Sequence, residues 1–144
     1  MLVKSILDTK GRRVVTIPRA TPVATAAARM QMEHLGALVV SADGYKIEGV
    51  VDERDIVRAY VRFGGELGAK SVGDVMREEV VVCAPGEPVR HVMDKMTRHR
   101  VRHLPVVDDG RLAGIISIGD VVKSRFEELE LEKDVIRDAF MARA

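Results

Sequence analysis

Residues 102–120 read RHLPVVDDGRLAGIISIGD, and residues 36–55 read GALVVSADGYKIEGVVDERD. The likeness extends outward, because residues 14–57 align with residues 80–122 with a single one-residue gap. Identical positions include Pro22 with Pro88, Met30 with Met96, Asp43-Gly44 with Asp109-Gly110, Gly49 with Gly114, and Asp55 with Asp120. The chain therefore contains two copies of one structural unit.

Each copy has the pattern of strand, helix, strand, turn, strand and helix. In the first copy residues 14–17 are a β-branched run, and Thr21-Pro22 is typical of a helix start, so we expect a helix from Val23 to Leu35. Apolar runs on both sides of Asp43-Gly44 predict a hairpin. The second copy predicts a strand at 80–83, a helix from Val89 to about Arg98, and a hairpin around Asp109-Gly110.

These elements predict a mixed α/β (α+β) fold of tandem repeats, each a small sheet with helices. Because neither half is large, we expect the two sheets to pack face to face around a pseudo-two-fold axis, with a ligand cleft on that axis. Gly64-Gly65 and Gly68 interrupt the pattern and suggest a linker. The expected divisions are a first domain at 1–65, a second at 66–126 and a helical extension at 127–144.

The composition argues against several classes of function. The 144 residues carry 23 Lys+Arg and 22 Asp+Glu, so the net charge of +1 gives no general attraction to nucleic acid or membranes. The sequence has no long apolar stretch or signal-peptide pattern, and we expect a cytoplasmic protein. It also lacks the P-loop and Gly-x-Ser-x-Gly patterns, so we expect no enzyme and no catalytic cofactor.

The cysteine and the histidines suggest no chemistry. Cys83 lies in an apolar run and is expected to be a small buried side chain. His99 and His103 have the most plausible spacing for a metal, but they flank the end of a predicted helix instead of sharing one face. We therefore expect no metal site.

The repeated motif at the last strand of each copy has two interpretations. Ser117 and Asp120 fit the start of a helix, with Ser117 as its N-cap. A cap, however, explains neither the repeated aspartate at Asp55 and Asp120 nor the glycine six residues earlier. Amide groups at a helix start beside a hydroxyl bind anions, and a carboxylate one turn away suits the two hydroxyl groups of a ribose.

The paired motifs resemble the cystathionine β-synthase (CBS) domain, and two in tandem resemble a Bateman module. The resemblance covers roughly residues 1–125. It implies an interdomain cleft that binds an adenosine ligand, such as AMP, ADP, ATP or S-adenosylmethionine, and a regulatory role without catalysis. AMP, or ADP or ATP, is the ligand we expect first.

Family positions carried over to this sequence imply two unequal sites. In the first, Asp120 would hold the ribose, while Ser117, Gly119, Arg102, His103 and Lys10 would lie near the phosphate. The purine would lie near Val15, Leu35, Gly36 and Ile115. The second site would involve Val50, Asp52, Arg54, Asp55 and Val81. There Asp52 replaces a hydroxyl residue and Arg54 is the one obvious cation, so we expect this site to be weaker.

Other functions stay open at this point. The pockets could be vestigial in a protein-interaction scaffold, or they could take a ligand of the S-adenosylmethionine type. Residues 90–103 are the one basic concentration, but they contain no aromatic side chain to stack on bases, so nucleic acid is an unlikely partner. The regulated protein cannot be named from the sequence.

The last predicted helix continues far beyond the repeat. Val122, Phe126, Leu129, Ile136 and Phe140 form an apolar stripe along it. The stripe could pack on the chain's own core or form a dimer contact. A single small module has little surface left to cover it, so we expect a homodimer.

Overall fold

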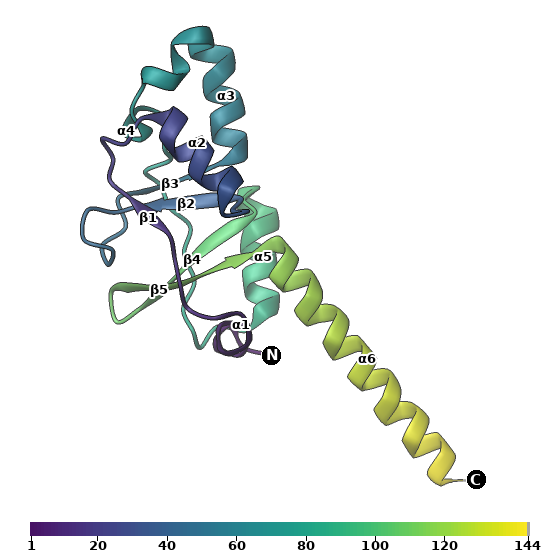
Figure 1. Ribbon diagram of the computed structural model, residues 1–144. Coiled ribbons are helices and arrows are strands. Elements are labelled where there is room, and N and C mark those ends of the chain that lie inside the picture. The colour runs from purple at the N-terminus through teal and green to yellow at the C-terminus, as the bar shows by residue number, and fades with distance from the viewer. Residues whose placement is uncertain (144) are drawn as a thin grey trace.

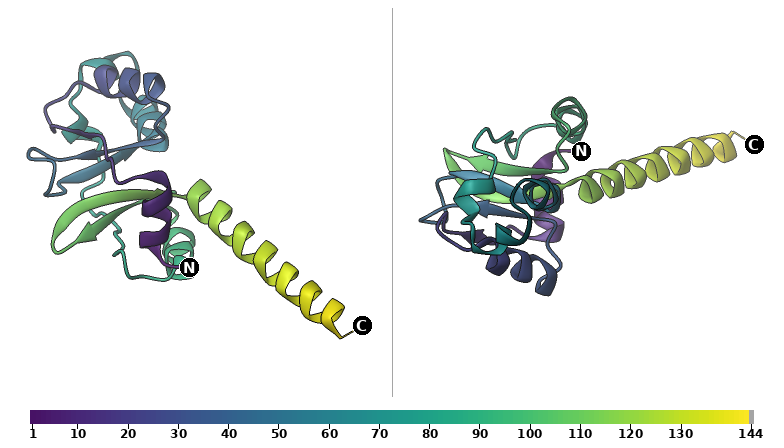
Figure 2. Two further views of the ribbon diagram at one scale, coloured as in Figure 1. Left: turned by 60° about the horizontal axis from the view of Figure 1, so that its bottom comes forward. Right: turned by 90° about the horizontal axis from the view of Figure 1, so that it is seen from above.

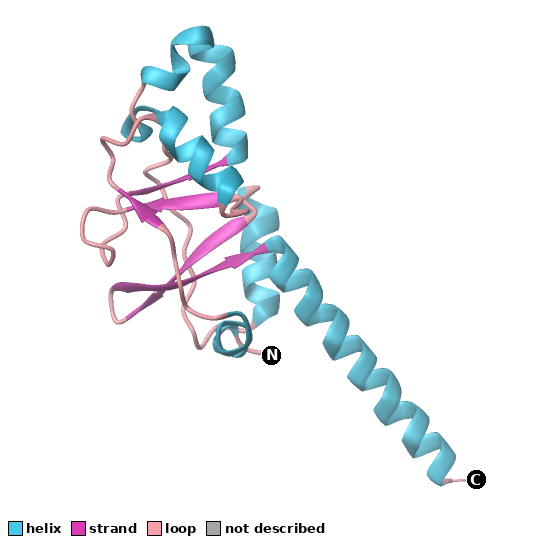
Figure 3. Cartoon of the chain, in the orientation of Figure 1, coloured by secondary structure: helices cyan, strands magenta, loops and turns pink. Residues whose placement is uncertain are grey.

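The computed structural model describes residues 1–143, which form a mixed α+β fold with one sheet in each repeat (Figures 1 and 3). In the first sheet the order is β1-β2-β3, with β1 parallel and β3 antiparallel to β2. The second sheet is an antiparallel pair. This confirms the predicted fold class. The strand bounds are β1 Thr16–Ile17, β2 Ala37–Val40, β3 Gly49–Asp52, β4 His103–Asp108 and β5 Arg111–Ser117.

Helices cover the outer sides of the two sheets. In Figure 1, α2, α3 and α4 lie around the first sheet, and α1 and α5 lie beside the second. The helix bounds are α1 Val3–Lys10, α2 Val23–Met32, α3 Glu53–Phe63, the 3-10 helix η1 Gly64–Ala69, α4 Val72–Val75, α5 Val89–His99 and α6 Ile118–Ala142.

Three local predictions differ from the structure. Residues 80–83 form no regular strand, because Cys83 alone pairs, through one parallel bridge to Val106. The second helix ends at Met32, since His34 adopts a left-handed conformation with a φ of 54° that stops the helix before Leu35. The glycine-rich segment is ordered as η1 instead of an open linker.

The two hairpins differ although both contain Asp-Gly. Asp109 and Gly110 join β4 to β5 directly and have φ values of 52° and 76°, the left-handed pair that a two-residue turn requires. In the first repeat Asp43-Gly44 lies in a longer loop. There Asp43 Oδ1 accepts hydrogen bonds from the amide N–H groups of Tyr45 and Lys46, both at 2.8 Å.

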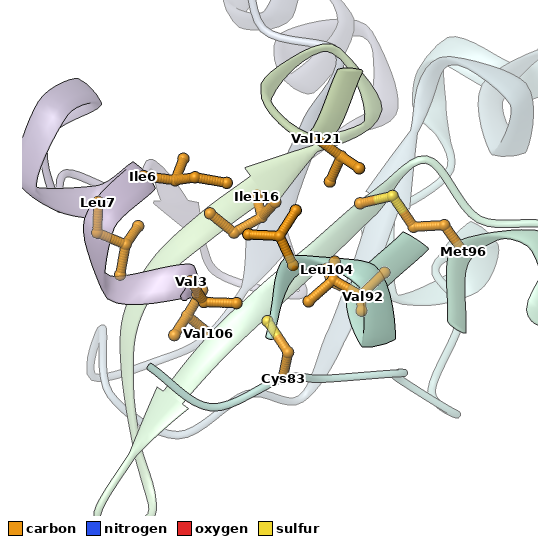
Figure 4. Close-up of a cluster of buried hydrophobic side chains, with 11 residues drawn as sticks. Val3, Ile6, Leu7, Cys83, Val92, Met96, Leu104, Val106, Ile116 and Val121 are labelled. Carbon is orange, nitrogen blue, oxygen red and sulfur yellow. The ribbon is translucent and has the colours of Figure 1, made fainter. Parts of the chain in front are cut away.

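The helix that precedes each repeat packs into the core of the other repeat. Val3, Ile6 and Leu7 of α1 belong to the core around β4, β5 and α5, as Figure 4 shows. Val72 of α4 belongs to the core around β2, β3 and α2. The halves therefore exchange their first helices, and each core depends on residues from both.

A glycine in each repeat leaves room for the exchanged helix. A Cβ at Gly49 would lie 2.6 Å from Met76 Sδ and 2.8 Å from the Arg77 carbonyl oxygen. A Cβ at Gly114 would lie 2.6 Å from Leu7 Cδ2. Such contacts are clashes in a close-packed interior, so both positions require glycine. The repeated glycine that the cap left unexplained therefore has a packing role.

The inner faces of the two sheets meet in a further apolar cluster. Ala37, Val39 and Val50 of the first sheet pack with Leu112 and Ile115 of the second. This is the face-to-face packing that two half-covered sheets need.

The last helix, α6, leaves the body and extends into solvent (Figures 1 and 2). Its buried residues, Val121 and Ser124, lie in the first two turns. All five residues of the apolar stripe are exposed, with exposed fractions from 55% at Leu129 to 75% at Phe140. The alternative in which the stripe packs on the chain's own core is therefore wrong.

Candidate functional site

The junction of β5 and α6 holds the second copy of the repeated motif. Ser117 Oγ accepts the amide N–H of Asp120 at 3.2 Å, and Asp120 Oδ2 accepts the amide N–H of Ser117 at 2.8 Å. This reciprocal pair is a capping box. The cap predicted at Ser117 is confirmed. Asp120 supplies half of the box, so the cap accounts for this aspartate as well as for Ser117.

A lysine from the exchanged helix joins this cap. Lys10 Nζ donates to Asp120 Oδ2 at 2.7 Å and to the carbonyl oxygen of Ile115 at 3.0 Å. Burial raises the pKa of Asp120, but the Lys10 ammonium and the Ser117 amide outweigh it and hold the pKa below its ordinary value. The carboxylate therefore stays ionised at neutral pH. Within residues 1–143 its second oxygen, Oδ1, has no hydrogen-bond partner, and it is available to a ligand.

His103 lies beside this cap and fills the space between the repeats. It is the cross-strand partner of Ser117, at the start of β4. A Cβ at Gly36 would lie 2.8 Å from His103 Nε2, so the imidazole ring lies directly against the Gly36 backbone. Burial lowers the pKa of His103, and its buried Nδ1 has no partner among the described residues. The ring is therefore neutral at pH 7.

The other residues predicted for the first site divide into two groups. Gly119 is exposed in the first turn of α6, and Arg102 is exposed beside it, with its carbonyl oxygen accepting the Ile118 amide at 2.8 Å. Val15 and Leu35 instead pack against the core of the first repeat. The structure thus brings the predicted polar groups together, whereas the Val15 and Leu35 side chains contribute to a core.

A cavity of about 130 Å³ adjoins Asp120, between α1 and α6. Its lining includes Thr9, Lys10, Asp120, Lys123 and Glu127. Small-molecule sites usually have volumes of about 300 Å³ or more. A nucleotide at Asp120 would therefore require Lys10, which lines this cavity, to move.

The first copy of the motif, at the start of α3, is also a capping box. Asp52 Oδ1 accepts the Asp55 amide at 2.8 Å, and Asp55 Oδ2 accepts the Asp52 amide at 2.9 Å. Two buried carboxylates thus lie side by side where the second copy has one carboxylate and one hydroxyl. Burial is the largest influence on Asp55 and raises its pKa above the ordinary value, against the lowering by the Asp52 amide and the Arg77 guanidinium.

Arg77 binds both carboxylates of this pair, and the sequence analysis missed it. Its Nε donates a hydrogen bond to Asp55 Oδ2, and its Nη2 donates one to Asp52 Oδ2, both at 3.0 Å. Arg54, the cation expected here, is exposed and makes no hydrogen bond or ion pair within residues 1–143. Val50 exchanges two backbone hydrogen bonds with Arg77, which fixes the arginine, and Val81 packs against the core of the second repeat.

The repeat itself contained a pattern that could have predicted the role of Arg77. Each copy is preceded by a cation at a similar distance, because Lys10 lies four residues before the first copy and Arg77 lies three residues before the second. Because the two first helices are exchanged, each cation reaches the aspartate of the other repeat, Asp120 or Asp55. A 330 Å³ cavity lies beside Arg77 and is also lined by Arg58 and Arg62.

Comparison with known proteins identifies the family. The sequence profile of the CBS domain matches residues 3–62 and 72–127, and the chain belongs to the CBS-domain family as a tandem pair. It resembles the crystal structure of the CBS-domain containing protein ATU1752 from Agrobacterium tumefaciens, with a TM-score of 0.84 and 44% identity over 87% of this chain and 99% of that one.

Two further similarities bear on function. The CBS domain pair of protein MJ0100, solved in complex with 5-methylthioadenosine and S-adenosyl-L-methionine, has a TM-score of 0.77 and 26% identity, covering 89% of this chain and 98% of that one. The mitochondrial CBS domain-containing protein CBSX3 of Arabidopsis thaliana is 37% identical over 69% of this chain. The chain spans half of the length of CBSX3.

Residues 1–143 contain no group of three His, Cys, Asp or Glu side chains arranged to hold a metal ion. None of the helices in that range is long and apolar enough to cross a membrane.

Proposed function

We propose that this CBS pair is a non-catalytic regulatory module that binds an adenine nucleotide at the Asp120 cap. The observation that carries this proposal is the cluster of Ser117, Asp120 and Lys10 at the start of α6. It combines a hydroxyl that caps the helix, an ionised carboxylate with one oxygen available, and an ammonium group hydrogen-bonded to that carboxylate.

The chemistry of the cluster matches the two polar ends of a nucleotide. Asp120 Oδ1 accepts hydrogen bonds from the ribose hydroxyl groups, and the positive end of α6 favours the phosphate. Lys10 then turns from Asp120 to the phosphate, and Arg102 is exposed nearby to assist it. Binding therefore replaces an ion pair between α1 and α6, which gives the module a way to change shape on binding.

S-adenosylmethionine or 5-methylthioadenosine is the second candidate. The observation in its favour is the similarity to the MJ0100 pair that was solved with both compounds. These ligands carry an adenosine but no phosphate, so Asp120 would hold them without help from Lys10. The same difference separates the two candidates experimentally.

Thermal unfolding with a series of ligands tests the proposal. A ligand at 100 times its dissociation constant stabilises the native state by about 2.7 kcal/mol. This corresponds to a rise of roughly 5 to 10 °C in melting temperature for a domain of this size. We expect AMP or ADP to produce the shift, and adenosine and GMP to produce less. The absence of a shift with any adenosine compound would favour a scaffold with vestigial pockets.

The Lys10→Ala variant distinguishes the two ligand classes. It should weaken AMP binding by about tenfold, because one charge-assisted hydrogen bond to phosphate is lost, and it should leave adenosine affinity undiminished. Lys4→Ala is the matched control, since Lys4 is an exposed lysine of the same helix. Isothermal titration calorimetry measures all four combinations. A tighter interaction with S-adenosylmethionine than with AMP, unchanged by Lys10→Ala, would support the second candidate.

A further inference from the structure

The exposed stripe on α6 follows a heptad pattern. Its positions 122, 126, 129, 136 and 140 are completed by Lys133, which gives successive spacings of four, three, four, three and four. This alternation is the pattern of a coiled-coil seam. The four-residue and three-residue steps continue without a break along the helix, from its second turn almost to its end.

The stripe is not the face by which α6 contacts its own body. Val121 and Ser124 are buried against the body, and Glu128 Oε1 accepts a hydrogen bond from the Met1 ammonium group at 2.7 Å. With 3.6 residues per turn, this face lies about a third of a turn from the stripe. A second helix could therefore lie along the stripe without displacing the body.

The distal part of α6 also needs a partner on energetic grounds. Isolated helices of this length are marginal in water, and most helical stability in proteins comes from packing an apolar face. Beyond Glu128 the helix holds Leu129, Ile136 and Phe140 in solvent, with exposed fractions of 55%, 69% and 75%. A contiguous exposed apolar surface of this kind is typical of an association site.

We propose that α6 pairs with α6 of a second copy of this chain in a parallel, in-register, two-stranded coiled coil. The seam consists of the apolar stripe and Lys133 from each copy. This proposal needs no ligand and is independent of the proposed nucleotide site.

Charge complementarity selects both the partner and its orientation. Arg125 and Glu132 flank one side of the seam, and Glu130 and Arg137 flank the other. In a parallel in-register pair, each residue of the first side faces the residue five positions later on the partner helix. Arg125 then faces Glu130 of the partner copy, and Glu132 faces Arg137 of the partner copy. Every one of these contacts is between opposite charges.

An antiparallel pair in the register that buries the whole stripe would have the reverse electrostatics. Each flank would then face its own counterpart, so that Glu132 would meet Glu132 and Glu130 would meet Glu130 across the dimer. Lys123 would likewise approach Arg137. Like charges in these positions oppose association. The flanks therefore disfavour an antiparallel pair.

Lys133 in the seam fits the same arrangement. A lysine at one seam position reduces stability but specifies the register and the number of helices. In a parallel coil the hole that receives position 133 is formed by positions 129, 132, 133 and 136 of the partner. The Lys133 ammonium group therefore comes beside the Glu132 carboxylate of the partner copy and can reach solvent past it.

Oxidative cross-linking of full-length variants tests the orientation. In a parallel register the two copies of position 136 face each other in the seam, so Ile136→Cys should give a covalent dimer under mild oxidation. Asp138→Cys is the control, because position 138 lies on the far side of the helix from the seam. The native Cys83 gives no background, since it is buried and burial raises the pKa of its thiol to about 12.

Charge reversal provides a second, independent measurement. Glu132→Arg should weaken the dimer by about tenfold or more in sedimentation equilibrium, because both symmetry-related contacts become repulsive. Adding Arg137→Glu to this variant should restore the affinity. In an antiparallel pair Glu132→Arg would only exchange one like-charge contact for another, so the single variant would change the affinity little. A monomeric full-length protein at micromolar concentration, equal cross-linking of the two cysteine variants, or no recovery in the double variant would overturn the proposal.

Discussion

At the residue scale, the two repeats place an aspartate at the same position of the same cap, and their surroundings make these aspartates different. Within residues 1–143, Asp120 keeps one oxygen without a partner, and its pKa is lowered because Lys10 and a backbone amide stabilise its charge. Asp55 is buried beside Asp52 and has a raised pKa, with Arg77 bound across both carboxylates. Asp120 therefore has an oxygen free for the ligand that we propose, whereas Arg77 binds both carboxylates of the Asp55 cap.

This difference predicts a structural role for Arg77. Removing one partner of a buried ion pair leaves an uncompensated charge, which commonly destabilises a protein by 3 to 5 kcal/mol, and the partial exposure of Arg77 reduces that figure. We expect Arg77→Ala to lower the free energy of unfolding by about 2 kcal/mol or more in urea denaturation at pH 7. Arg54→Ala is the matched control and should change it by less than about 0.5 kcal/mol. Equal effects of the two variants would show that Arg77 has no special role.

At the element scale, local patterns predicted the elements better than they predicted how the elements pack. The repeat, the helix starts at Pro22 and Pro88, and the tight turn at Asp109-Gly110 are local signals, and the structure confirms them. The prediction of a strand at 80–83 was wrong. A regular strand needs a neighbouring strand along its length, and the β-branched residues there do not determine whether one is present. The exchange of α1 and α4 between repeats is a long-range arrangement, and the sequence analysis did not foresee it.

Because the first helices are exchanged, the segment after α4 packs against position 49 so closely that only glycine fits there. An alanine methyl group there would meet the carbonyl oxygen of Arg77 at 2.8 Å as well as the Met76 side chain, and backbone cannot move aside as easily as a side chain. We expect Gly49→Ala to destabilise the protein by about 1 to 3 kcal/mol, the usual range for overpacking. Gly86→Ala is the control, because a Cβ at Gly86 has no neighbour within 4 Å. Chemical denaturation of both variants checks the expectation, and a neutral Gly49→Ala would contradict the packing role.

At the scale of the whole molecule, each half depends on the other. Each core includes a helix from before the other repeat, and the two sheets share a third cluster between them. In the binding mode that we propose, a nucleotide separates Lys10 from Asp120 and would act on α1, which belongs to the second core, and on the first turn of α6. Since α6 also carries the exposed stripe, a change at the cap has a direct mechanical route to the surface proposed for dimerisation.

The candidate site could be predicted only in part. The capped helix and its aspartate follow from a short motif, and Lys10 and His103 were placed by resemblance near the same point. The Arg77 bridge, the Lys10–Asp120 ion pair and the packing of His103 on Gly36 depend on how distant segments meet. Such contacts are set by tertiary packing, which local sequence patterns do not encode.

The central claim is that a single strong adenine-nucleotide site lies at Asp120, and titration calorimetry of three proteins tests it most directly. Wild-type protein should bind AMP with one dominant event. Asp120→Asn preserves an oxygen for the cap but removes the charged acceptor of two ribose hydroxyl groups, and it should weaken binding by about a hundredfold. Asp55→Asn, the matched change in the other cap, should alter the dissociation constant by less than about threefold. Equal losses in the two variants, or unchanged binding in Asp120→Asn, would contradict the account.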